Sequence, residues 1–132
     1  MKVLIADDDA LSRKILEDAL SEWGYEILMA HNGNEAWDIL EKNDRPNLAV
    51  LDWIMPGMDG VEICRRLRKL SLPNYVYVIL LTARSKLEDV IKGLESGADD
   101  YIIKPFHHEE LKSRLKIGQR IIELEHRILR LA

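Results

Sequence analysis

The stretch KVLIADDDAL, residues 2–11, joins an apolar segment directly to a cluster of acids. A short apolar run from Val3 to Ala6 is followed at once by Asp7, Asp8 and Asp9. Two like charges about 4 Å apart repel each other by roughly 4 kcal/mol at an effective dielectric constant near 20. These carboxylates therefore need either separation or a positive charge between them.

The composition is typical of one globular domain. The chain has 132 residues, of which 47% are apolar and 32% charged, and its net charge of -4 gives no general electrostatic reason to bind nucleic acid. The single cysteine, Cys64, excludes an internal disulfide and is typical of a small buried apolar group in a reducing compartment. The apolar run after Lys2 is too short for a signal peptide or a membrane span. We therefore expect a cytoplasmic domain without membrane contact.

Five short apolar runs alternate with helical patterns along the chain. The runs predict strands at residues 2–6, 26–30, 48–52, 76–81 and 100–104. Between them, apolar residues recur at helical spacing, and the fourth such pattern contains Leu87, Val90, Ile91 and Leu94.

Helix boundaries are marked by residues with specific backbone preferences. Ser85-x-x-Glu88 predicts a capping box at the start of the fourth helix. Gly24 and Gly97 stand where helix ends favour a left-handed backbone.

The alternation predicts a parallel sheet with helices on both faces, because helix-length crossovers are right-handed. The first, third and fourth runs are almost continuously apolar, as expected of central strands, so the second and fifth are placed at the edges. The result is a doubly wound, flavodoxin-like (βα)5 three-layer sandwich with strand order 2-1-3-4-5. The alternative is an open Rossmann-type order, but no G-x-G-x-x-G follows the first strand.

Polar residues gather at the predicted carboxyl ends of the strands, which meet at one edge of a parallel sheet. The residues at these ends are Asp7, Asp8, Asp9, Asp52, Thr82 and Lys104. Taken singly, each has an ordinary structural interpretation, and Asp9 in particular suits the N-cap of the next helix. It is the combination at one edge that predicts a site.

The chemistry of this set favours phosphoryl transfer. Clustered carboxylates without histidine or cysteine suit Mg²⁺, and an ammonium and a hydroxyl can bind phosphoryl oxygens. The absence of a G-x-x-x-x-G-K-[ST] motif argues against a bound nucleotide. We therefore expect the phosphoryl group to be carried on an aspartate as an acyl phosphate.

Four segments, IADDDA, LDWIMPGMDG, LLTAR and YIIKPF, resemble the receiver domain of bacterial two-component response regulators. The resemblance extends from residue 2 to about residue 118. It implies that Asp52 is the phosphoacceptor, that a sensor histidine kinase or phosphotransfer protein is the partner, and that the phosphorylated state controls an output. It also implies a switch that assists its own phosphorylation and dephosphorylation rather than an enzyme.

The same resemblance implies roles for the other site residues. Mg²⁺, or Mn²⁺, would be held by Asp8 directly, by Asp7 mainly through water, by Asp52 and by the backbone carbonyl of Ile54. Thr82 and Lys104 would bind the phosphoryl group, and Tyr101 would be the aromatic switch that turns inward as Thr82 moves. The Lys104-Pro105 peptide bond would be cis.

Two positions depart from common choices in the family. Ile54 and Arg84 would flank the water that hydrolyses the acyl phosphate, and neither is a good acceptor for orienting that water. A long-lived phosphorylated state is therefore expected. Two alternatives stay open: a receiver-like scaffold that takes no phosphate, and an aspartyl-phosphate phosphatase of related topology, which would carry an acid where Ile54 stands.

From His107 onward the chain is predicted to form one long helix, so the receiver domain spans 1–118 and an extension spans 119–132. One apolar stripe consists of Leu111, Leu115 and Ile122, and its near part is expected to pack on the sheet. A second stripe at heptad spacing consists of Ile117, Ile121, Leu124, Ile128 and Leu131. The second stripe favours a coiled-coil signalling linker and a homodimer, in which Arg120 would face Glu125 of the partner. The alternative is a surface helix that packs both stripes on its own domain.

Overall fold

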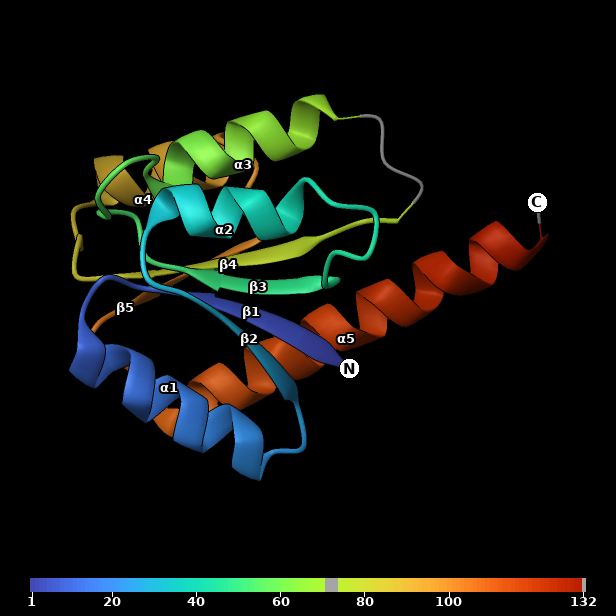
Figure 1. Ribbon diagram of the computed structural model, residues 1–132, viewed down its shortest axis with the longest axis horizontal. Coiled ribbons are helices and arrows are strands. Elements are labelled where there is room, and N and C mark those ends of the chain that lie inside the picture. The colour runs from blue at the N-terminus through green and yellow to red at the C-terminus, as the bar shows by residue number, and fades with distance from the viewer. Residues whose placement is uncertain (71–73, 132) are drawn as a thin grey trace.

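The computed structural model, which describes residues 1–70 and 74–131, is a five-stranded sheet between two layers of helices (Figure 1). The strands are β1 (Lys2–Ala6), β2 (Glu26–Ala30), β3 (Leu48–Leu51), β4 (Tyr77–Thr82) and β5 (Asp100–Ile103). The helices are α1 (Ala10–Glu22), α2 (Gly33–Leu40), α3 (Gly60–Lys69), α4 (Leu87–Glu95) and α5 (His108–Leu131).

The strand order is β2-β1-β3-β4-β5, and every pair is parallel, so the predicted flavodoxin-like topology is confirmed and the Rossmann-type order is wrong. β3 and β4 are buried along their whole length, and β1 is buried from Val3 onward. β2 and β5 are less buried and form the two edges. Central strands covered on both faces explain why these segments are continuously apolar.

Alternate residues of each strand face opposite layers. Leu4 and Leu51 belong to a core cluster that includes residues of α2 and α3, whereas Ile5 and Val50 belong to a cluster that includes residues of α1 and α5. Figure 1 shows α2, α3 and α4 on one face of the sheet and α1 and α5 on the other. All strands therefore deliver their carboxyl ends to one edge, between two well-packed layers.

Helix α5 is buried against the sheet from Leu111 to Ile122 and continues beyond it (Figure 1). Leu111, Leu115 and Ile122 are all fully buried, so the first stripe packs on the domain along its whole length and not only in its near part. The half-exposed carboxylate of Glu125 accepts the backbone N–H of Tyr75 at 2.9 Å, which ties the helix to the segment just before β4. Ala132, the last residue of the predicted extension, lies outside the described residues.

The predicted capping box at Ser85 is wrong. Helix α4 begins one residue later, with Lys86 as its N-cap in an extended conformation and without a side-chain hydrogen bond. The glycine predictions are confirmed, because Gly24 and Gly97 have φ angles of +92° and +119°.

Helix α4 packs on the sheet through a glycine, while three of the four apolar residues of its pattern stay exposed. Leu87, Ile91 and Leu94 are 43–74% exposed, whereas Gly93 is the buried residue of the helix. A Cβ atom at Gly93 would lie 2.8 Å from the Tyr101 ring and 3.0 Å from Leu80. The missing side chain therefore lets the Tyr101 ring approach the helix backbone.

Candidate functional site

The sheet register brings the polar strand ends together. Ala6 pairs with Leu51, and the Asp52 N–H donates to the Ala6 carbonyl at 2.9 Å, so the acids that follow β1 and β3 emerge side by side. On the other side, Thr82 pairs with Ile103, and the Lys104 N–H donates to the Thr82 carbonyl at 2.8 Å. The predicted gathering of these residues at one edge is therefore found.

Three carboxylates form the acidic part of the site. Oxygen atoms of Asp7, Asp8 and Asp52 lie within 4.8 Å of one another, with Asp7 buried, Asp52 half-buried and Asp8 exposed. This donor set consists of oxygen atoms alone, which fits a hard divalent cation.

Asp9 has a separate role, as expected. Its side chain accepts the Ser12 N–H at 2.8 Å and caps α1, and the hydrogen bonds from Ser12 lower the pKa of the Asp9 carboxyl. The Asp9 N–H in turn donates to Asp7 Oδ1 at 2.9 Å. The start of α1 thus orients the buried carboxylate of Asp7.

Lys104 supplies the positive charge that the acids require. Its Nζ donates to Asp7 Oδ2 at 2.7 Å and to Asp52 Oδ2 at 3.0 Å, with 21% of the side chain exposed. Burial alone would lower the pKa of Lys104, but the hydrogen bonds to Asp7 and Asp52 carry the pKa above its usual value. The ammonium therefore stays charged and holds the two strand ends together.

The remaining predicted residues surround this ion pair. Thr82 is buried at the end of β4, and its Oγ1 lies 3.5 Å from the backbone nitrogen of Arg84. Tyr101 is half-buried on β5 and donates its hydroxyl to the Arg84 carbonyl at 2.8 Å. Ile54 is 52% exposed. The Lys104-Pro105 peptide bond is cis, as the resemblance implied.

Sequence reasoning missed the part that Trp53 takes in this region. Trp53 directly follows Asp52 and is only 3% exposed. The Arg84 guanidinium lies over its ring at 4.7 Å from the centroid, and the Tyr101 ring meets it edge-on at 6.4 Å. In the sequence, an aromatic residue next to a strand end is indistinguishable from an ordinary core residue.

Comparison with known proteins identifies the family. The sequence matches the response regulator receiver domain over residues 3–116, which is most of the chain. The chain belongs to the response regulator receiver family. This receiver domain is similar to the receiver domain of the Francisella response regulator 1452, with a TM-score of 0.83 and 37% identity over 90% of this chain and 96% of that one.

Two curated relatives extend the comparison. The receiver is 50% identical over 122 residues to the probable transcriptional regulator ycf27 of Porphyridium aerugineum, covering 92% of this chain and 49% of that protein. It is 44% identical over 116 residues to the response regulator MprA of Mycobacterium avium (strain 104), covering 88% of this chain and 50% of that protein. The chain thus spans about half the length of these relatives.

Hydropathy gives one further finding. Within residues 1–70 and 74–131, no helix combines the length and apolar character needed to cross a membrane.

Proposed function

We propose that this receiver accepts a phosphoryl group on Asp52 from a phosphohistidine of a sensor histidine kinase or phosphotransfer protein, and that the acyl phosphate switches a partner or output. The observation that carries the proposal is the position of Lys104 Nζ, which contacts both Asp52 and Asp7. A fixed cation beside a half-buried carboxylate is what in-line attack on an anionic phosphoryl group requires.

In the transfer step, an Asp52 carboxylate oxygen forms a bond to phosphorus as the bond from phosphorus to the imidazole nitrogen breaks. The electron pair of that bond stays with the leaving imidazole. Lys104 neutralises charge on the phosphoryl oxygens, and the Thr82 hydroxyl donates a hydrogen bond to one of them. Positioning and electrostatics supply most of the acceleration.

The acidic cluster fits Mg²⁺ or Mn²⁺, which Asp7, Asp8 and Asp52 would hold together with the backbone carbonyl of Ile54. When bound, the cation supplies positive charge to the phosphoryl oxygens. Asp7 is oriented for this role by its hydrogen bond from the Asp9 N–H.

Incubation with acetyl phosphate and Mg²⁺, followed by intact-mass analysis, tests the proposal. The unaltered chain should gain one phosphoryl group, and Asp52→Asn should gain none, whereas Asp38→Asn on α2 serves as a matched acid control. Uptake retained by Asp52→Asn would reject the assignment, and no uptake by the unaltered chain would favour a scaffold. Steady turnover of a generic phosphate ester would instead indicate a phosphatase.

A groove beside Lys104 is the surface that we propose for the phosphohistidine partner. It has a volume of about 450 Å³ and lies between α1 and the segment after β5, with Ile15, Pro105, Phe106 and Lys104 among its lining residues. Because Lys104 lines this groove and also contacts Asp52, an occupant of the groove lies next to a side chain that touches the acceptor. Ile15→Lys should lower transfer from a phosphorylated kinase about tenfold while leaving acetyl phosphate uptake unchanged; equal loss with both donors would contradict this surface.

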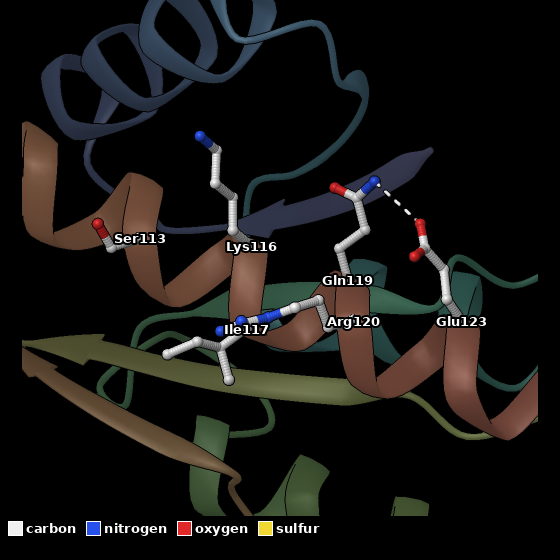
Figure 2. A pocket seen from close by; sticks show the side chains of 6 residues that line it. All are labelled: Ser113, Lys116, Ile117, Gln119, Arg120 and Glu123. Atoms are coloured by element: carbon white, nitrogen blue, oxygen red, sulfur yellow. Dashed lines mark hydrogen bonds between the residues drawn. The ribbon is translucent and has the colours of Figure 1, made fainter.

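We also propose that the second stripe of α5 pairs with the same stripe of a second chain. The five residues of the stripe are 37–88% exposed. Figure 2 shows Ile117 and Arg120 together on one side of the helix, with Lys116 extending from another. Although Glu125 binds the Tyr75 N–H, its half-exposed carboxylate retains acceptor capacity for Arg120 of the second copy. The heptad spacing and this charge pair favour a parallel homodimer.

Sedimentation velocity over a range of concentrations tests the dimer. Leu124→Glu, at a residue that is 53% exposed, should shift the chain towards monomer because it places a charge in the apolar seam. Leu11→Glu on α1, where the side chain is 68% exposed, is the control and should leave the association unchanged. An unaltered chain that stays monomeric at every concentration would contradict the proposal.

A further inference from the structure

The buried indole of Trp53 lies under two cations. The Arg84 guanidinium is 4.7 Å from the ring centroid, and Lys92 Nζ is 5.9 Å from it. Tryptophan is the aromatic side chain that binds cations most strongly. The Trp53 ring therefore binds the Arg84 guanidinium through a cation–π contact and also belongs to the core.

Arg84 links several elements that surround Trp53. Its guanidinium contacts Asp89 of α4 at 3.4 Å, and its carbonyl accepts the hydroxyl of Tyr101 from β5 at 2.8 Å. The Tyr101 ring in turn meets Trp53 edge-on. The stack on Trp53 thus holds together β5, α4 and the loop that follows β4.

Arg84 follows the end of β4, at the edge of the sheet where the neighbouring β3 delivers Asp52. Arg84 lies two residues after Thr82, and its backbone nitrogen is 3.5 Å from Thr82 Oγ1. Its side chain is 44% exposed, so it can leave the ring without crossing the core. A phosphoryl group brings close to two negative charges and strong acceptor oxygens, which bind a guanidinium more tightly than an indole face does.

We propose that Trp53 competes with the Asp52-bound phosphoryl group for the Arg84 guanidinium, and so sets how readily this receiver switches. The inference rests on the proposed function. Trp53 acts as a positioning residue: without phosphate it keeps Arg84 over the ring, and with phosphate the guanidinium moves to the phosphoryl oxygens. That movement separates Arg84 from Asp89 and loosens the loop that Tyr101 contacts.

A double-mutant cycle on beryllofluoride binding tests the competition. Beryllium is titrated calorimetrically in excess fluoride and Mg²⁺, as a mimic of the phosphoryl group. Trp53→Leu should tighten binding about two- to five-fold, the range that matches an exposed cation–π contact, because it frees Arg84. Arg84→Met should weaken binding, and adding Trp53→Leu to Arg84→Met should change nothing further.

Lys86→Met removes a cation from the same loop and serves as the control, in whose background the effect of Trp53→Leu should persist. Should Trp53→Leu fail to fold, Trp53→Phe keeps a ring with a weaker cation interaction, and a smaller tightening that also depends on Arg84 is expected. If Trp53→Leu or Trp53→Phe changes beryllofluoride binding equally in the Arg84 chain and in the Arg84→Met chain, this inference is overturned. The proposed function is not affected by that result. No binding by the unaltered chain would overturn it together with the proposed function.

Discussion

Replacing Lys104 with methionine should make this receiver bind Mg²⁺ more tightly while accepting phosphate more slowly. The substitution keeps the length of the side chain and removes the ammonium that lies 2.7 Å from Asp7 and 3.0 Å from Asp52. At an effective dielectric constant near 20, each contact corresponds to about 6 kcal/mol of gross Coulomb attraction, most of which is offset by desolvation. Without the Lys104 ammonium, two carboxylates 4.8 Å apart repel each other by about 3 kcal/mol at the same dielectric constant.

The metal-free Lys104→Met chain should therefore be less stable than the unaltered chain by on the order of 3 kcal/mol. Mg²⁺ no longer competes with an ammonium for Asp7 and Asp52, so its affinity should rise about tenfold, equivalent to about 1.4 kcal/mol. Phosphoryl uptake should fall by about a hundredfold, because a preorganised donor to the transferring group is lost.

Urea unfolding with and without Mg²⁺ measures the stability, and calorimetric titration measures the Mg²⁺ affinity. The added stability from Mg²⁺ should be larger in Lys104→Met than in the unaltered chain. Lys42→Met, an exposed lysine after α2, is the matched control for the substitution itself. Unchanged metal-free stability together with unchanged Mg²⁺ affinity would refute the view that Lys104 neutralises the acids.

Three further outcomes are expected. Gly93→Ala should destabilise the fold by about 1–3 kcal/mol in thermal unfolding, because the added Cβ meets the Tyr101 ring. Tyr101→Ala in the same chain should relieve part of this loss, and a Gly93→Ala chain that is more stable than the unaltered one would contradict the contact. Burial raises the pKa of the Cys64 thiol to about 12, so the folded state keeps a proton that the unfolded chain loses above pH 9. Stability should therefore fall by about 1.4 kcal/mol per pH unit above pH 9, and Cys64→Ala should remove that part of the slope in urea unfolding at pH 8 to 10. Ile54→Asn should shorten the half-life of the acyl phosphate, because an amide at position 54 can orient the attacking water. Intact-mass analysis over time measures the half-life, and an unchanged value would contradict the role given to position 54.

Strand polarity explains why so much of the site could be predicted from the sequence. Asp7, Asp52, Thr82 and Lys104 follow apolar runs that only a parallel sheet accommodates, and parallel strands end at one edge. The N-cap role of Asp9 depends on local geometry alone, so it was equally predictable.

What the sequence could not provide are contacts between elements. The apolar pattern of α4 does not reveal that its helix packs through Gly93, because the space there is created by the Tyr101 ring from another strand. The Trp53–Arg84 stack likewise depends on side-chain directions at two separate strand ends. Periodicity reports which face of an element is apolar, and it says nothing about what occupies the opposite surface.

The long helix α5 gives the receiver a lever arm. Glu125 still holds the helix through the Tyr75 N–H, and six residues later Leu131 is 88% exposed. At 1.5 Å of rise per residue, the arm beyond Glu125 is about 9 Å long. A tilt of about 10° at Glu125 would move the tip by about 1.5 Å, the scale of shifts that change contacts at interfaces. A small adjustment of the sheet can therefore be amplified mechanically at a distance from Asp52.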